Sequence, residues 1–342
     1  MTHLSLDEFD FSLPDHLIAQ KPAEKRDESR LLHYQIKTKT IEDHSFLTFP
    51  NCIPKNAVLV LNNTKVIKAR VIATRSSGAK IECFFIEKIK PGYWEILIKN
   101  AKRVQINEFL IVDHNHTIQI LNKTGKYAKV KIIGPSIDLS FLEQFGNMPL
   151  PPYIKSNQND DNVRYQSIFA SEPGAIAAPT ASLHFTEETF AQLKSKNIEI
   201  IYITLHIGIG TFNPIEKDNI IEHNMHYETY KVSAESAIKL NTAKQNKQPI
   251  FAIGTTSARC LESNFKNGKF HAISEKTNLF IYPGYTFKAI DGLLTNFHLP
   301  KSSLFILIAA LVGKNNVKRI YQHAIKQAYR FFSYGDAMLI TE

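Results

Sequence analysis

Two different patterns of hydrophobic and polar residues divide the chain. Between residues 65 and 147, six short runs are rich in β-branched and aromatic residues, and several alternate apolar with polar positions. These runs are 68–76, 79–89, 92–100, 109–113, 116–122 and 127–133. Turn residues such as Ser77-Gly78 and Pro91-Gly92 separate them. This pattern predicts a small antiparallel β-barrel or sandwich.

Outside that segment, expected helices alternate with expected strands. The strands are predicted at 56–64, 198–206, 249–254, 277–282 and 292–297, and the helices at 186–197, 234–246, 257–265, 302–313 and 316–330. Such alternation favours a parallel sheet covered by helices. The expected fold class is α/β: a large α/β domain with a mostly parallel sheet, carrying an inserted small antiparallel β-barrel domain. We place the α/β domain at residues 1–64 and 148–342 and the insert at 65–147.

Composition narrows the class of protein. A hydrophobic content of 44% with 21% charged residues is typical of a soluble globular protein. The longest apolar run, 304–312, is too short to cross a bilayer, so no membrane contact is expected. The acidic start of the chain lacks the apolar core of a signal peptide, and the three cysteines are far apart. We therefore expect a cytoplasmic protein with neither a disulfide framework nor a metal site.

The net charge of +9 is concentrated in the β segment. Residues 65–131 hold 14 Lys or Arg against 5 Asp or Glu, and the rest of the chain is balanced. A local basic face is the electrostatic footprint of a site for polyanions, most often nucleic acid. A solvated lysine-rich surface is the alternative. The residues expected to bind RNA are Lys65, Lys68, Arg70, Arg75, Lys102 and Arg103.

Polar and small residues follow the expected strands of the α/β domain. Ligands of α/β sheets bind beyond the carboxyl ends of the strands, so these residues predict a cleft. The G-x-G at 208–210 is no dinucleotide loop, because Asn213 stands where a third glycine is needed. The segment 254–257 could bind an anion at a helix start or could simply cap that helix. His223, His226 and Glu228 have metal-ligand chemistry, but their spacing is only suggestive.

Seven motifs in order resemble one known family. They are PGAIAAPTASLHF, TLHIGIGTF, HNMHYE, GTTSARCLES, FIYPGY, TNFHLPKSSL and YRFFSYGDAM. Together with stretches near the N-terminus they resemble the S-adenosylmethionine:tRNA ribosyltransferase-isomerase family of queuosine biosynthesis over essentially the full length.

The resemblance implies a defined reaction. The ribosyl unit of S-adenosylmethionine is transferred to 7-aminomethyl-7-deazaguanine at the tRNA wobble position and isomerised, giving epoxyqueuosine-tRNA and releasing adenine and methionine. S-adenosylmethionine is then a consumed substrate, and no further cofactor is expected. The implied partner is the tRNA anticodon arm, and we expect a monomer. Two rival interpretations stay open: an S-adenosylmethionine-dependent tRNA methyltransferase and a non-catalytic tRNA-binding protein.

The same resemblance assigns candidate roles to residues in the motifs. The candidates for proton transfer are His184, His206 and His298. Glu262 or Asp336 is expected to bind ribose hydroxyls or the amine. The residues expected to hold the methionine carboxylate are Thr255, Thr256, Ser257 and Arg259. The remaining substrate-binding candidates are Thr180, Gly208, Gly210, Thr211, Tyr282, Asn296 and Phe297, of which Tyr282 and Phe297 are expected to stack on a base.

Departures from the family pattern are small. Ser182 stands where the family usually has glycine, which puts a positive φ there in doubt. Ile209 and Ala258 replace residues of other sizes, and neither removes a polar candidate. We therefore expect an active enzyme.

Overall fold

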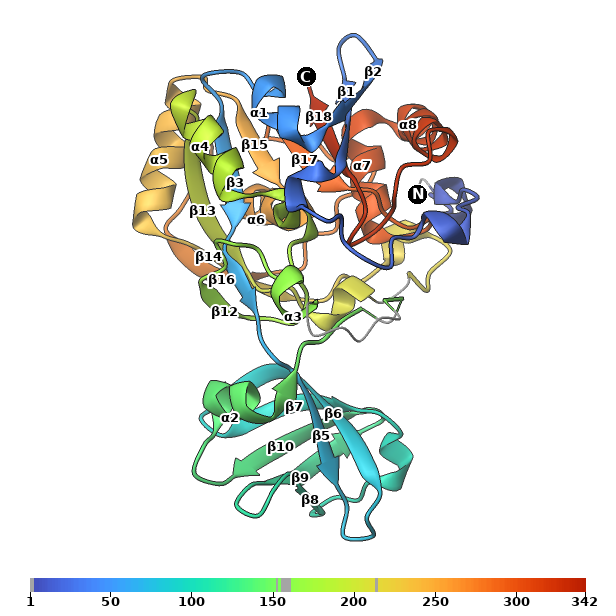
Figure 1. Cartoon of the computed structure of the whole chain (residues 1–342), viewed down its shortest axis with the longest axis vertical. Coiled ribbons are helices and arrows are strands. Elements are labelled where there is room, and N and C mark those ends of the chain that lie inside the picture. Colours follow the sequence, from blue (N-terminus) through green and yellow to red (C-terminus); the bar gives the residue numbers. More distant parts are fainter. Residues whose placement is uncertain (1–2, 152, 155–160, 213–214) are drawn as a thin grey trace. The chain divides into compact units, whose positions relative to one another are not determined.

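The structure is a computed structural model that describes residues 3–151, 153–154, 161–212 and 215–342 (Figure 1). It divides into two compact units. One, here called the α/β unit, spans residues 1–65, 152–172 and 178–342. The other, the barrel unit, spans 66–151 and 173–177.

A nine-stranded mixed sheet forms the centre of the α/β unit. Its strand order is β16 (Ile273–Thr277), β14 (Glu228–Val232), β13 (Glu199–Leu205), β3 (Val58–Asn62), β15 (Ile250–Ile253), β17 (Gly292–Asn296), β18 (Ala337–Thr341), β1 (Arg30–Gln35) and β2 (Thr40–Ser45). The four strands β13, β3, β15 and β17 are parallel to one another, and β18 is parallel to β1. The other four pairings are antiparallel.

The prediction of a mostly parallel sheet is therefore wrong. Antiparallel strands flank the parallel centre on both sides, because β14 and β16 follow β13 on one side while β18 returns against β17 on the other. The strand expected at 277–282 lies instead at 273–277, and the residues after Thr277 run as a loop.

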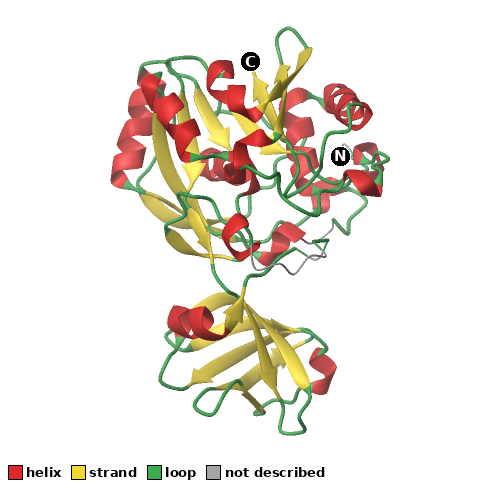
Figure 2. Ribbon diagram, viewed as in Figure 1, coloured by secondary structure: helices red, strands yellow, loops and turns green. Residues whose placement is uncertain are grey.

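Helices cover the sheet (Figure 2). The longer ones are α4 (Glu187–Ser195), α5 (Ala234–Gln245), α6 (Thr255–Asn264), α7 (Ser303–Val312) and α8 (Lys314–Lys326), with the short α1 (Phe49–Cys52) and α3 (Asp161–Arg164). The side chains of Thr186, Ser233 and Ser302 cap α4, α5 and α7. Strand β3 is buried at every position, as expected of a strand covered on both faces. No helix in the described part is long and apolar enough to span a bilayer.

Short elements complete the α/β unit. Seven 3-10 helices are η1 (Leu6–Phe9), η2 (Asp15–Leu17), η3 (Arg26–Glu28), η4 (Phe46–Thr48), η6 (Thr180–His184), η7 (Ile209–Phe212) and η8 (Ile220–Glu222). The strands β4 (Thr64–Val66) and β12 (Glu172–Ala175) form a separate ladder, whose residues 66 and 173–175 belong to the barrel unit. Helix η6 packs against β17, which brings the first and sixth of the seven motif regions to the parallel centre of the sheet.

The barrel unit is a closed six-stranded antiparallel barrel, as predicted. Its order is β5 (Arg70–Thr74), β6 (Lys80–Lys90), β7 (Tyr93–Ile98), β10 (Tyr127–Ile133), β9 (Thr117–Thr124) and β8 (Phe109–Ile111), closed by pairing of β5 with β8. Alternate side chains point inward, and Phe85 and Trp94 pack edge-to-face in the core. The unit also carries η5 (Ala101–Arg103), α2 (Asp138–Phe145) and β11 (Gly146–Asn147).

Candidate active site

The parallel strands β13, β3, β15 and β17 end along one edge of the sheet. His206 follows β13, Asn62 ends β3, and Asn296 ends β17. Gly254 follows β15 with φ +88°, and a Cβ there would lie 3.8 Å from the Cβ of Ala181 in η6. This close approach brings η6 beside the start of α6. The expected polar strand ends therefore form one continuous rim.

His184 in η6 is a buried polar group beside this rim. Its Nδ1 lies 2.7 Å from Oγ of Ser29, and its Nε2 is buried without a hydrogen-bond partner in the described structure. Burial lowers the pKa of His184 to about 4, although the nearby carboxylate of Asp336 opposes this shift. The imidazole is therefore neutral at pH 7 and has one nitrogen available for a ligand.

Asn296 lies beside His184 with its amide fixed in orientation. Its Nδ2 donates to the backbone oxygens of Phe332 at 3.0 Å and Ser333 at 3.4 Å. Its Oδ1 is fully buried and has no partner in the described structure, and its amide favours the protonated form of His184. Few buried polar atoms stay unpaired in folded proteins. The two atoms lie in side chains that also interact with each other, and this pair is the candidate point for a ligand.

Asp336 holds the C-terminal segment next to this centre. Its carboxylate accepts from the backbone N–H of Arg30 at 3.0 Å and of Arg330 at 2.8 Å, and from the Arg330 guanidinium at 3.2 Å. It is 1% exposed, so its charge acts in a medium that screens it weakly. Asp336 thus positions Arg330 and favours a positive charge on His184 rather than offering free oxygens to a substrate.

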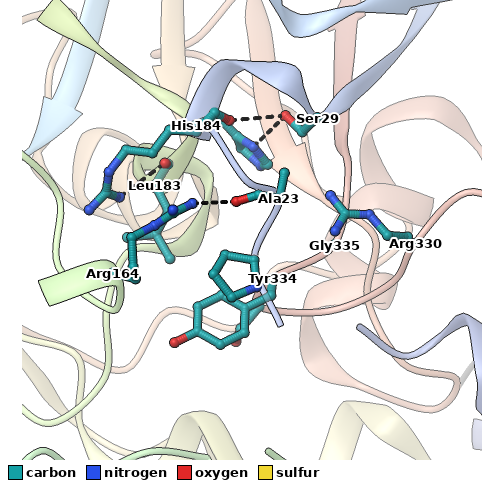
Figure 3. Close-up of a pocket in the computed structure, with 11 residues that line it drawn as sticks. Ala23, Ser29, Arg164, Leu183, His184, Arg330, Tyr334 and Gly335 are labelled. Carbon is teal, nitrogen blue, oxygen red and sulfur yellow. Dashed lines mark hydrogen bonds between the residues drawn. The ribbon is translucent and has the colours of Figure 1, made fainter. Parts of the chain in front are cut away.

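A small pocket lies against these residues (Figure 3). Its cavity of about 20 Å³ has room for a water molecule. Arg26 and Arg164 point their guanidinium groups at backbone oxygens of Leu183, Gln166, Ala23 and Glu24. Neither forms an ion pair with a carboxylate in the described part of the chain. The pocket is therefore electropositive and suited to an anionic group.

A second centre forms around Arg259 in the first turns of α6. Its guanidinium pairs with the carboxylate of Glu228 through Nη1 and donates from Nε to the backbone oxygen of Leu279 at 3.0 Å. Arg259 is 4% exposed, and its Nη2 is buried without a partner in the described structure. The fork of a guanidinium binds carboxylates through two nitrogens. The unpaired Nη2 is thus placed to receive an anionic ligand group.

The glycines at 208 and 210 serve this second centre. The backbone N–H of Gly208 donates to Glu228 at 3.0 Å. A Cβ at Gly210 would lie 2.6 Å from the side chain of His226, so only glycine fits there. Glu228 and His226, which the sequence also offered as metal ligands, are the residues that make these contacts. The contacts explain the two side chains without a metal. The side chain of Thr211 lies outside the described residues.

Two further rim residues make specific contacts. His206 is half-buried, its Nδ1 lies 2.8 Å from Oγ1 of Thr64, and burial lowers its pKa. The amide of Asn62 donates to Oγ1 of Thr256 at 3.3 Å and to the backbone oxygen of Leu205 at 2.9 Å.

The rings of Tyr282 and Phe280 are 5.6 Å apart and half-buried, which leaves aromatic surface for a base.

Three other candidate residues have structural roles. The carboxylate of Glu262 accepts from the Tyr285 hydroxyl at 3.0 Å and from the backbone N–H groups of residues 288–290. Phe297 is fully buried among Tyr321, Tyr329 and Phe331, so its ring is not available for stacking. The hydroxyl of Ser257 donates to the backbone oxygen of Ile253 at 2.7 Å. These three side chains therefore stabilise loops and core rather than bind a substrate.

His298 is separated from His184 by the sheet. Its Nε2 lies 2.9 Å from Oγ1 of Thr295, and its backbone N–H donates to Tyr321 at 3.1 Å. Successive side chains of a strand point to opposite faces, so Thr295 and Asn296 lie on different sides of β17. Burial lowers the pKa of His298 to about 3. His298 is thus a neutral core histidine.

The buried histidines predict acid sensitivity. Their folded-state pKa values of about 4 for His184 and about 3 for His298 lie below the unfolded value of 6.5. The stability that they contribute is therefore present above pH 6.5 and is lost as the pH falls toward those values. When the pH is lowered from 7 to 5, each of these histidines should reduce the free energy of unfolding by about 2 kcal/mol. Urea unfolding at pH 7 and pH 5 should show that His298→Gln loses less unfolding free energy on acidification than the unaltered protein does. An equal loss in the two proteins would contradict the assignment of His298 as a neutral buried histidine.

The six expected RNA-binding residues divide into two groups. Lys68, Arg70 and Arg75 pair with Glu143, Glu82 and Glu108, at 3.1, 2.7 and 2.6 Å. Lys65, Lys102 and Arg103 are exposed and form no ion pair in the described part of the chain. Only the second group therefore carries charge that is available to a polyanion.

Several site residues were not predicted. Ser29, Arg26 and Arg164 contribute to the His184 pocket from segments whose patterns are those of ordinary loops. Glu228 was considered only as a metal ligand, yet it pairs with Arg259. At Ser182 the backbone φ is not positive, so the serine is tolerated, and its buried hydroxyl has no partner in the described structure.

The rim and the two units define a class of protein. A mixed α/β sheet whose strand ends gather a neutral histidine, a guanidinium with one unpaired nitrogen and an electropositive pocket is the framework of an enzyme for anionic substrates. The chain belongs to the queuosine biosynthesis protein family, whose model matches residues 6–340.

Individual relatives are similar over nearly the whole chain. An S-adenosylmethionine:tRNA ribosyltransferase-isomerase of Sulfurihydrogenibium sp. is 43% identical over 99% of this chain and 100% of its own length. The protein of the same name from Desulfitobacterium hafniense is 43% identical over 98% and 100%. The crystal structure of S-adenosylmethionine tRNA ribosyltransferase from Thermotoga maritima is 34% identical, with a TM-score of 0.57 over 97% of this chain and 99% of that one. These matches confirm the resemblance and the expected enzyme class, transferase and isomerase.

Proposed function

We propose that this chain transfers the ribosyl moiety of S-adenosylmethionine to 7-aminomethyl-7-deazaguanine at the tRNA wobble position and isomerises it. The product is epoxyqueuosine-tRNA, and adenine and methionine are released. The names of the relatives support the reaction. The observation on which the site assignment rests is the pair of buried unpartnered atoms, Nε2 of His184 and Oδ1 of Asn296.

His184 is the residue that we assign to proton transfer. The reaction requires removal of a proton from the carbon next to the sulfonium, which the positive sulfur acidifies. A neutral imidazole can take that proton, and the resulting cation is stabilised by Asp336 and by Oδ1 of Asn296. The same imidazolium can return the proton to adenine as it leaves. His206 is the second candidate, since it is half-buried and also holds a lowered pKa.

Arg259 is the residue that we assign to the methionine carboxylate. Its unpaired Nη2 supplies a charged donor, and its Nη1 is already fixed by Glu228. The start of α6 next to it adds backbone N–H groups and the positive end of the helix dipole. Thr255 and Thr256 lie at the same helix start, and Thr180 begins the adjoining η6. The half-exposed ring of Tyr282 is the stacking surface that we assign to a base.

The half-buried guanidinium groups at this pocket suit a phosphate that lies outside the cavity, because the cavity itself has room only for a water molecule. The guanidinium groups of Arg26 and Arg164 lie beside His184 and lack carboxylate partners among the described residues. A phosphate flanking the target nucleotide would neutralise them and set the deazaguanine near His184.

The outward face of the barrel suits the anticodon arm. Tyr93 on β7 has the ammonium groups of Lys90 and Lys131 at 4.3 and 5.8 Å from its ring centre. Tyr127 has Lys126 at 5.7 Å. Aromatic rings interleaved with lysines are typical of surfaces that bind exposed nucleic-acid bases and their phosphates. Cytoplasmic location and a monomeric state stay predictions of the sequence.

Removing the exposed charges of η5 should weaken tRNA binding in a salt-dependent way. Lys102→Gln/Arg103→Gln removes two cations that no carboxylate in the described structure neutralises, so the slope of log K against log salt should fall by about 2. Filter binding of tRNA between low and high salt measures this slope. The matched control is Lys68→Gln, whose ammonium already pairs with Glu143. Equal slopes for both variants would remove η5 from the tRNA surface.

The proposed reaction is tested by its small-molecule products. Purified protein is incubated with S-adenosylmethionine and tRNA that carries the aminomethyl-deazaguanine, and the products are resolved by liquid chromatography. Adenine and methionine that appear only with that tRNA support the proposal. S-adenosylhomocysteine would instead indicate a methyltransferase, and tRNA binding without turnover would indicate a binding protein.

A further inference from the structure

We propose that His33, His44 and Cys52, with the carboxylate of Glu42 beside them, form a Zn²⁺ site at the edge of the large sheet. The ligand atoms of the two histidines and the cysteine all lie within 4.8 Å of one another. This is the cluster of metal-ligating side chains found among the described residues. None of the four residues lines the pocket beside His184, so the site is separate from the proposed reaction centre.

The register of the β1–β2 hairpin places three of the four side chains on one face. His33 stands directly opposite Glu42, and His44 is two residues further along β2. Because side chains alternate across a strand, Glu42 and His44 share the face of His33. The two imidazole rings are 6.2 Å apart. Cys52, the last residue of α1, reaches this face from the helix that follows the hairpin.

Polar contacts already hold the two histidines on the face of Glu42. Nε2 of His33 lies 3.0 Å from Oγ1 of Thr341, and its Nδ1 lies 3.9 Å from Oε2 of Glu42. Nε2 of His44 lies 3.2 Å from the same carboxylate oxygen. Metal-binding histidines typically use the second ring nitrogen for such an orienting contact, which Thr341 supplies here.

The donor set fits zinc. Two imidazole nitrogens and one thiolate are ligands that Zn²⁺ prefers, and the carboxylate of Glu42, 3.2 Å from Nε2 of His44, is placed to complete a four-coordinate set. His44 and Cys52 are partly exposed and Glu42 is exposed, so these side chains have room to close on an ion. Binding forms the Zn–S bond and releases the thiol proton of Cys52 to solvent.

The site would fasten the edge of the sheet. Strand β2 is the last strand of the nine and pairs only with β1 in the described structure. A metal shared by β1, β2 and α1 would hold this edge strand against the helix. Because a ligand of the folded state stabilises it by mass action, Zn²⁺ should raise the Tm of the full-length protein.

The test uses the full-length protein after removal of metal by a chelator. Titration with ZnCl₂ in competition with a chromophoric chelator should give one equivalent bound per chain. Cys52→Ser and His44→Gln should each weaken binding roughly 100-fold, since even outer contacts of a metal site are worth 10- to 100-fold. The matched control is His271→Gln, a histidine outside the cluster, which should bind as the unaltered protein does.

A second measurement follows the reactivity of the Cys52 thiol directly. Cys83 and Cys260 are buried, so Cys52 is the thiol that an alkylating reagent reaches in the folded chain. One equivalent of Zn²⁺ should slow that alkylation at least tenfold, and Co²⁺ should give a thiolate charge-transfer band that Cys52→Ser abolishes. Unchanged affinity in Cys52→Ser and His44→Gln, or no protection of the thiol, would overturn the proposal. Ribosyl transfer by Cys52→Ser should persist, which separates this result from the proposed reaction.

Discussion

His184→Gln should lower kcat by roughly 10²- to 10⁴-fold, the range expected when a positioned acid–base group is removed. Glutamine keeps polar atoms near the positions of the imidazole nitrogens, so the contact with Ser29 and the packing against Phe46 should largely persist. The KM for S-adenosylmethionine should change little, because the loss concerns proton transfer rather than binding. Steady-state kinetics at saturating tRNA measures both constants.

Two further variants separate catalysis from folding. His271→Gln replaces a histidine outside the rim and should leave kcat unchanged. Ser29→Ala removes only the partner of Nδ1, so it should lower kcat less and shift the pH profile of kcat. A His184→Gln protein with an unaltered Tm and nearly full kcat would contradict the role of His184 and move the assignment to His206.

Arg259→Lys should raise the KM for S-adenosylmethionine by roughly 30-fold or more. Truncating one partner of a buried charged hydrogen bond typically costs about 2–5 kcal/mol. The ammonium of lysine lacks the forked nitrogens with which a guanidinium binds Glu228 and a ligand carboxylate at the same time. Isothermal titration with S-adenosylmethionine alone measures the loss without the tRNA. Affinity within threefold of the unaltered protein would exclude Arg259 from the methionine subsite.

The choice of lysine matters for the fold. Glu228 is 4% exposed, so an uncharged residue at 259 would leave its carboxylate buried without a cation and cost about 3–5 kcal/mol. Lysine keeps the positive charge and should keep most of the stability. The matched control is Arg319→Lys on α8, whose guanidinium donates to the backbone of Lys39 outside the rim. That variant should show an unaltered KM and Tm.

The barrel could be predicted from the sequence because its strands are short and half-buried. A strand such as Tyr93–Ile98 alternates buried and partly exposed positions, so its hydrophobic residues recur at every second position of the sequence. The direction of strands in the large sheet could not be predicted in the same way. β14 and the edge strand β16 are antiparallel strands with many polar residues, so they lacked the apolar run by which β3 and β15 were found.

Candidate residues could be predicted by type and by chain position but not by side of the sheet. His184, Asn296 and Arg259 were expected at strand ends or helix starts and lie there with unpaired atoms. His298 follows the same strand as Asn296 but lies with Thr295 on the opposite face. Glu262 shares a helix with Arg259, yet its carboxylate is used by a loop. Such choices depend on tertiary contacts, which local sequence does not contain.

The central claim is that the ribosyl carbons of S-adenosylmethionine, and not its methyl group, end on tRNA. The most direct measurement incubates the protein with S-adenosylmethionine labelled separately in the ribose and in the methyl group, and counts the label in purified tRNA. The account predicts label on tRNA from the ribose only, and none with His184→Gln within the same time. Label transferred from the methyl group, or label from neither, would contradict it.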